Sequence, residues 1–137
     1  MIDTIYASLA GILPFAQYFL LAIILLVLFV RIYVRVTPHN EFALIAANNV
    51  AAAVAFGGAI IGFALPLASA ISHSLSLIDC AIWSAVALVA QISTFFALRL
   101  VVKQISERIV RGELATALLV ASSAITTGII NAACMTY

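Results

Sequence analysis

The chain has 137 residues, of which 66% are apolar and 8% are charged, and its mean hydropathy is +1.29. Soluble domains carry about 25% charged residues, so this composition excludes a soluble domain and indicates an integral membrane protein. The net charge is only +1, and we expect no nucleic-acid partner.

The first apolar stretch predicts a membrane helix over residues 11–34. A helix needs about 20 residues to cross roughly 30 Å of hydrocarbon. The segment before it contains Asp3 and no basic residue, and the apolar run ends with Arg31 and Arg35. A cleavable signal peptide has a basic start and a short apolar core. We therefore expect this stretch to stay in the membrane as the first helix.

The second apolar stretch, residues 49–71, is rich in small side chains. In lipid, close backbone contact and interhelical hydrogen bonds decide which helices associate. Gly58 and Gly62, four residues apart, therefore predict a helix-packing face, either inside one chain or between copies in a homo-oligomer. Pro66 removes the backbone hydrogen bond to the carbonyl of Gly62. We expect a bend there, either tolerated by neighbouring helices or used as a hinge.

The third and fourth stretches, residues 80–102 and 114–135, carry polar side chains at membrane depth. These candidate intramembrane polar residues are Gln91, Ser123, Thr127 and Asn131. The last three recur every four residues, which places them on one face of a helix. A buried amide needs partners from other helices or from water. The residues are either hydrogen-bonding links between helices or the lining of a narrow hydrated path.

All basic residues lie at or beside two of the three polar breaks, residues 35–48 and 103–113. They are Arg31, Arg35, Arg99, Lys103, Arg108 and Arg111. The middle break, residues 72–79, and both ends of the chain have none. The positive-inside rule therefore places the first and third breaks in the cytoplasm and both termini in the periplasm.

Aromatic residues agree with this orientation. Tyr6, Trp83 and Tyr137 fall at the predicted outer interface, and Tyr33 and Phe42 fall at the inner one. Tyrosine and tryptophan are enriched at these depths because their rings are amphipathic.

The two halves of the chain look alike. Residues 37–45 lead into Asn48 and Asn49, and residues 105–110 lead into Gly112 and Glu113. Ile105, together with the apolar residues that follow at helical spacing, predicts a short helix on the cytoplasmic surface. We predict an all-α, single four-helix membrane domain over residues 1–137, built as two similar hairpins that point the same way.

Several segments resemble a known family. They are residues 49–70, Trp83 with residues 86–91, and the ending 128–135. Together they resemble the YjfL-like family of small bacterial inner-membrane proteins, classed as domain of unknown function 350. The resemblance covers about residues 37–136, with Asn48 where the family pattern has glycine and Cys80 outside the pattern. It implies four membrane helices, association with envelope-stress and phage-shock-type proteins, and no established activity.

Residues that could carry chemistry are few. His73 and Asp79 flank the outer break beside several serines, but a nucleophile needs a fixed base and an oxyanion site. His39 and His73 lie on opposite sides of the membrane and cannot share a metal ion. We expect no enzyme and no cofactor. No carboxylate, lysine or histidine lies at mid-depth, which argues against proton-coupled transport.

Cys80 and Cys134 both fall near the outer ends of their helices. An oxidising periplasm would allow a disulfide between them. The alternative is that both are buried free thiols that pack as small apolar groups.

These observations favour a non-enzymatic, homo-oligomeric scaffold or sensor of the bacterial inner membrane, linked to envelope stress. Its candidate docking residues for a peripheral cytoplasmic protein or anionic lipid headgroups are Lys103, Arg108 and Arg111. The same charges are also explained by membrane orientation alone. The alternative function is an oligomeric channel for ions or small solutes, lined by Gly58, Gly62 and the intramembrane polar residues.

Overall fold

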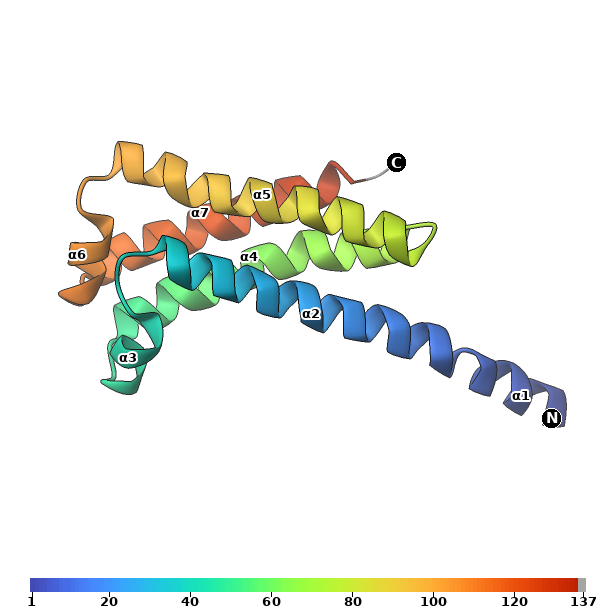
Figure 1. Ribbon diagram of the computed structural model, residues 1–137. Coiled ribbons are helices and arrows are strands. Elements are labelled where there is room, and N and C mark those ends of the chain that lie inside the picture. The colour runs from blue at the N-terminus through green and yellow to red at the C-terminus, as the bar shows by residue number, and fades with distance from the viewer. Residues whose placement is uncertain (136–137) are drawn as a thin grey trace.

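The computed structural model describes residues 1–135, and every regular element within them is a helix (Figure 1). The helices are α1 Ile2–Ala10, α2 Ile12–Val36, α3 Glu41–Ala46, α4 Val50–His73, α5 Leu77–Val101, α6 Ile105–Val110 and α7 Leu114–Ala133. Four segments are long and apolar enough to cross a membrane: residues 2–36, α4, α5 and α7. The prediction of an all-helical chain with four membrane spans is confirmed at this level.

The N-terminal segment differs from the prediction, which began the first helix at residue 11. Helix α1 precedes α2, with Gly11 between them, and together they form an apolar segment of 35 residues. At about 1.5 Å per residue this segment is about 50 Å long, well beyond the roughly 30 Å hydrocarbon layer. The apolar residues Ile2, Ile5, Tyr6 and Leu9 recur at helical spacing, which explains why helix forms despite the polar residues between them.

The short helices α3 and α6 end in the same way. Each is followed by a residue in the left-handed conformation, Asn48 with φ 66° and Gly112 with φ 81°. The backbone amide of Asn48 donates to Ile45 O and that of Gly112 to Ile109 O, both at 2.9 Å. Glycine adopts this conformation without strain, and asparagine is among the few other residues that tolerate it. The asparagine in place of the expected glycine therefore keeps the same turn.

Helices α3 and α6 lie at one end of the molecule, and the α4–α5 turn lies at the other (Figure 1). Helix α4 is central: eleven of its residues are buried inside the protein, compared with three in α2 and none in α1. Helices α5 and α7 pack against α4. Helix α2 packs against α4 and α5 at its end nearest α3, and it diverges from the bundle toward α1.

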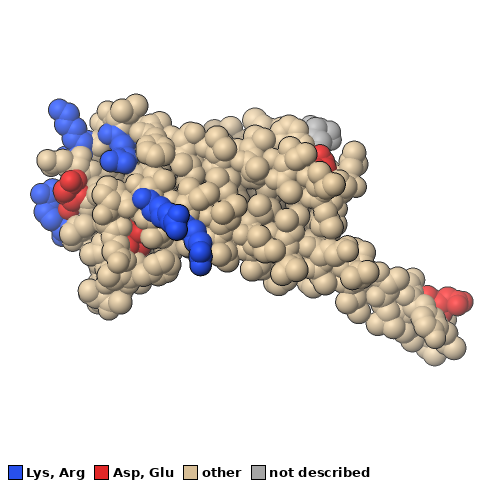
Figure 2. All heavy atoms as spheres, in the orientation of Figure 1, with Lys and Arg blue, Asp and Glu red and all other residues tan. Residues whose placement is uncertain are grey.

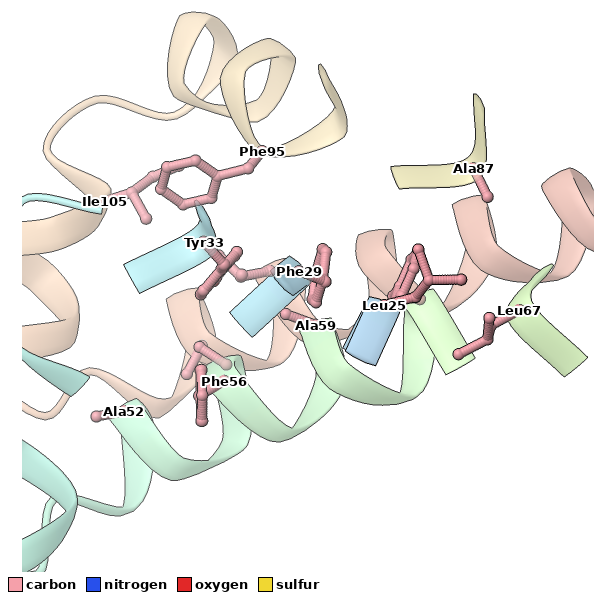
Figure 3. Packing of buried hydrophobic residues seen from close by; sticks show 14 of the residues in the cluster. Leu25, Phe29, Tyr33, Ala52, Phe56, Ala59, Leu67, Ala87, Phe95 and Ile105 are labelled. Atoms are coloured by element: carbon pink, nitrogen blue, oxygen red, sulfur yellow. The ribbon is translucent and has the colours of Figure 1, made fainter. Parts of the chain in front are cut away.

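Contacts between aromatic rings attach α2 to the bundle (Figure 3). The ring of Phe29 lies 4.6 Å from that of Phe63 on α4. The ring of Tyr33 lies 5.6 Å from Phe95 on α5 and 5.9 Å from Phe56 on α4. Each such pair contributes about 0.5–1.5 kcal/mol beyond burial, which suits a membrane interior where burial itself gives no preference for other helices.

The predicted aromatic belts are therefore only partly right. Tyr33 is 4% exposed and belongs to the core, because other rings surround it on α4 and α5. Phe42 at the same end is 57% exposed, and Tyr6 on α1 is 68% exposed. Trp83 is half-buried on α5, and Tyr137 lies outside the described residues.

Candidate functional site

Helices α4 and α7 are in backbone contact through their glycines. A Cβ atom added at Gly58 would lie 2.4 Å from Cβ of Ala121, and one added at Gly128 would lie 2.1 Å from the carbonyl oxygen of Gly62. Pro66 has no N–H to donate to that carbonyl, so the oxygen faces the Cα of Gly128 across the seam. Such Cα–H···O contacts are typical of close helix pairs.

The predicted packing face of Gly58 and Gly62 is thus occupied inside one chain. Helix α7 covers it, so it has no room for a second copy. Pro66 is buried, and α4 continues through it from Val50 to His73. The same contacts leave no space between α4 and α7 at these glycines.

A second seam, between α5 and α7, contains most of the predicted polar residues. Thr94 Oγ1 donates to Thr127 Oγ1 at 3.0 Å, and Asn131 Nδ2 donates to Ala87 O at 3.3 Å. Ser123 is half-buried, and within residues 1–135 its side chain makes no hydrogen bond. The stripe on α7 therefore binds α5 at two of its three levels.

Gln91 lies on the buried face of α5 at the middle of this seam. Its Nε2 donates to Ala124 O at 3.2 Å, whereas its Oε1 has no hydrogen-bond partner in the described part of the chain. Gln91, Tyr33 and Thr94 help to line a cavity of about 20 Å³. A cavity of this size holds about one water molecule, which is the partner that an unpaired buried acceptor requires.

A buried carboxylate lies at the end of the bundle that carries α3. Glu41 is 1% exposed, and its Oε1 accepts a hydrogen bond from the hydroxyl of Thr37. His39 Nε2 lies 3.4 Å from the same oxygen. Glu41 Oε2 and His39 Nδ1 have no hydrogen-bond partner among the described residues. Burial lowers the pKa of His39, and the opposing effect of the Glu41 charge is smaller.

Sequence reasoning missed this cluster because Glu41 lies in a polar break that is typical of surface residues. Asn40 caps α3, with its Oδ1 accepting from Ala43 N at 3.1 Å, and Glu41 is the first residue of that helix. The available signal was the four-residue spacing between Thr37 and Glu41, which brings the two side chains together only if the backbone turns between them.

Lys and Arg side chains gather at the end of the molecule that carries α3 and α6 (Figure 2). Helix α6 packs against the bundle through Ile105 and Ile109, which are 3% and 0% exposed. The side chains of Arg108 and Arg111 face outward, with Glu113 at 3.8 Å and 3.6 Å respectively. The prediction of a short amphipathic helix here is confirmed.

Asn49 connects the two halves of the chain at this end. Its Oδ1 caps α4 by accepting from Ala52 N at 3.0 Å. Its Nδ2 donates to Ile109 O at 3.1 Å and to Val110 O at 3.2 Å on α6. One side chain therefore starts α4 and fixes α6 beside it. Lys103 is exposed in the turn before α6.

The break at residues 72–79 holds no arrangement of the Ser–His–Asp type in the described residues. His73 Nδ1 lies 2.9 Å from the carbonyl oxygen of Ser69, one turn earlier in α4. Asp79 accepts from the amide of Leu75 at 3.0 Å and from no histidine. Both side chains therefore make their contacts at the ends of their own helices. No group of three metal-ligating side chains occurs within residues 1–135.

Both cysteines are free thiols in the structure. The disulfide alternative is therefore wrong for this structure. Cys80 is buried, as expected of a small apolar group, and its Sγ lies 4.0 Å from Ser84 Oγ. Cys134 is exposed, so the expectation that it is buried is wrong. It lies just beyond the end of α7.

Comparison with known proteins agrees with the resemblance found in the sequence. Residues 7–135 match the family model described as Domain of Unknown Function (DUF350). The chain is 39% identical over 129 residues to the UPF0719 inner membrane protein YjfL of Escherichia coli strain K12, covering 94% of this chain and 98% of that protein. The values are the same for the YjfL protein of Escherichia coli O157:H7. No solved structure matches the chain.

Proposed function

The chain belongs to the Domain of Unknown Function (DUF350) family and is a small inner membrane protein, and on this premise we propose that it is a non-enzymatic scaffold or sensor. In this proposal its α6 surface, defined by Lys103, Arg108 and Arg111, docks a peripheral cytoplasmic protein. The chain forms two similar hairpins, α2–α3–α4 and α5–α6–α7, with both termini in the periplasm. The gathering of basic residues at the α3 and α6 end supports this orientation.

The fixed position of α6 is the observation that carries the proposal. Charges that only orient a protein in the membrane act from flexible loops as well as from rigid elements. Here two buried isoleucines and the Asn49 hydrogen bonds hold α6 in one position, with Arg108 and Arg111 outward. A rigid, outward-facing basic helix is suited to binding a partner because little ordering is needed on association.

The charge of this end indicates the chemistry of the partner. Its six Lys and Arg residues outnumber its three carboxylates, Glu41, Glu107 and Glu113, of which only the last two are exposed. Six minus three leaves a charge of +3, so the partner presents an acidic surface. The envelope-stress and phage-shock-type proteins that the family resemblance implies are the first to test.

A photocrosslinking amino acid in place of Val110 tests docking in native membranes. We expect a crosslinked cytoplasmic protein from the wild-type chain and its loss in R108Q/R111Q. The matched variant R108K/R111K keeps both charges and should keep the crosslink. A partner that crosslinks equally well to all three chains would contradict docking through these charges.

We further propose that the protein is a homo-oligomer that associates through α1 and the adjoining part of α2. These segments diverge from the bundle, and none of the nine residues of α1 is buried. Native mass measurement of the assembly from mild detergent checks this. A mass equal to one chain at every protein concentration would contradict it.

The alternative function, an oligomeric channel, has one observation in its favour. Gln91 Oε1 is unpaired beside a small cavity among α2, α4, α5 and α7. A path through one subunit is closed by the α4–α7 contacts, so it would have to run between subunits. Liposomes that contain only this protein should then conduct ions. Absence of flux at every voltage, with a crosslinked partner recovered, would reject the channel.

A further inference from the structure

A groove with an apolar wall and a basic edge runs between α2 and α3. Its volume is about 480 Å³, and its apolar lining comes from α2 residues 26–34 and from Phe42 on α3. Arg31 and Arg35 complete the lining at the end nearest α3. This volume lies within the about 300–1,000 Å³ that is typical of small-molecule sites.

The two arginines form a pair on one face of α2. They are four residues apart, so their side chains project from successive turns about 6 Å apart along the helix. Both are exposed. Neither forms a salt bridge with an acidic residue in the described part of the chain, whereas Arg108 and Arg111 both lie near Glu113. Two unpaired guanidinium groups at the rim of an apolar groove are suited to bind an anion with an apolar tail.

We propose that this groove binds one anionic phospholipid, with its phosphate between Arg31 and Arg35 and one acyl chain along α2 against Phe42. Guanidinium groups bind phosphate oxygens through paired, charge-assisted hydrogen bonds. Basic pockets between membrane helices on the cytoplasmic side bind lipid headgroups in the same way. The inference is independent of protein docking at α6, because the two sites share no residue.

Phe42 also connects this groove to the core. Its ring contacts Phe56 on α4 edge-on, with the centroids 5.5 Å apart. An acyl chain in the groove would therefore press on a ring that packs against α4. Bound lipid should hold α3 against α2 at the end where the Glu41 cluster is buried.

Native mass spectrometry of the purified full-length chain in detergent provides the test. Palmitoyl-oleoyl phosphatidylglycerol is titrated against phosphatidylcholine with the same acyl chains. We expect one phosphatidylglycerol to bind in preference to phosphatidylcholine. The variant R31Q/R35Q should bind it about 30-fold more weakly, because each basic residue near the headgroups contributes about fivefold.

Two further variants separate a built site from diffuse surface charge. R108Q/R111Q removes the same charge from the same end and should keep the affinity within about twofold. F42A keeps the charge but removes part of the groove wall, and should weaken binding by severalfold. Equal loss in R108Q/R111Q, or no loss in F42A, would overturn the proposal in favour of nonspecific attraction.

Inorganic phosphate distinguishes a lipid site from a small-anion site. Millimolar phosphate should leave bound phosphatidylglycerol in place, because the acyl chain supplies part of the affinity. Displacement of the lipid by phosphate would overturn the proposal. Circular dichroism of each variant in the same detergent shows whether the helices are intact. If R31Q/R35Q fails to fold, the single variants R31Q and R35Q take its place, each with an expected fivefold loss.

Discussion

Helix α7 contacts α4 and α5 in two different ways. Toward α4 it presents Gly128 and Ala121, and the two backbones touch. Toward α5 it presents Thr127 and Asn131, and the contact is made by hydrogen bonds of 3.0–3.3 Å. The first seam depends on the absence of side-chain atoms and the second on their presence. A membrane interior permits both, since neither relies on removing apolar surface from water.

The difference predicts that the α4 seam tolerates added atoms far less than the α5 seam tolerates lost ones. A backbone contact cannot relax without moving a whole helix, because packed interiors have few voids. A lost hydrogen bond costs little by comparison, because the polar groups find other partners.

The largest effect is expected for Gly128→Ala. Its new Cβ would meet the carbonyl of Gly62 at 2.1 Å, so α4 and α7 must separate. We expect a loss of about 3 kcal/mol, at the upper end of overpacking, measured by reversible unfolding in dodecyl sulfate mixed micelles followed by circular dichroism. A loss below about 1 kcal/mol would show that α4 and α7 are packed less tightly than the 2.1 Å contact indicates.

Gln91→Ala should follow, with a loss of about 2 kcal/mol. The substitution removes the hydrogen bond to Ala124 and enlarges the neighbouring cavity. Gln91→Leu is the matched control in the same unfolding assay. It keeps the volume and removes the unpaired Oε1, so its loss should stay below about 1 kcal/mol. Equal losses in the two variants would mean that the bond, and not the volume, determines the effect.

Thr127→Val should cost only about 0.6 kcal/mol, the typical value of a hydrogen bond between membrane helices. Valine keeps the shape of threonine but cannot accept from Thr94. A double-mutant cycle with Thr94→Val measures the coupling directly. Additive losses at the two positions would contradict a hydrogen bond between them.

The smallest effect, and one of opposite sign, is expected for Gly57→Ala. Gly57 neighbours Gly58 on α4, but a Cβ added there would meet no atom within 4 Å. Alanine favours helix over glycine by about 0.5–1 kcal/mol in water. We expect a gain of about 0.5 kcal/mol in the same unfolding measurement. A clear loss would show that Gly57 packs against something outside the single chain.

The sequence alone determined the properties that depend on the contrast between residue types along the chain. Hydropathy located the four spans, and helical periodicity located α6 with its buried isoleucines. The likeness of the two halves of the chain indicated that Asn48 and Gly112 are equivalent positions. These features follow from the spacing of residues along the chain, so they could be predicted without knowing which helices pack together.

Only the tertiary structure decided which helix meets which. A face of small residues fits any other such face, so the sequence left Gly58 and Gly62 open between α7 of the same chain and a second copy. Buried and lipid-facing surfaces are equally apolar in a membrane protein, so hydropathy does not distinguish residues that face the core from residues that face lipid. For that reason Tyr33 was assigned to the membrane interface, although its ring packs against Phe56 on α4 and Phe95 on α5 in the core. Glu41 was taken for a surface residue because it lies in a polar break, although it is buried beside Thr37.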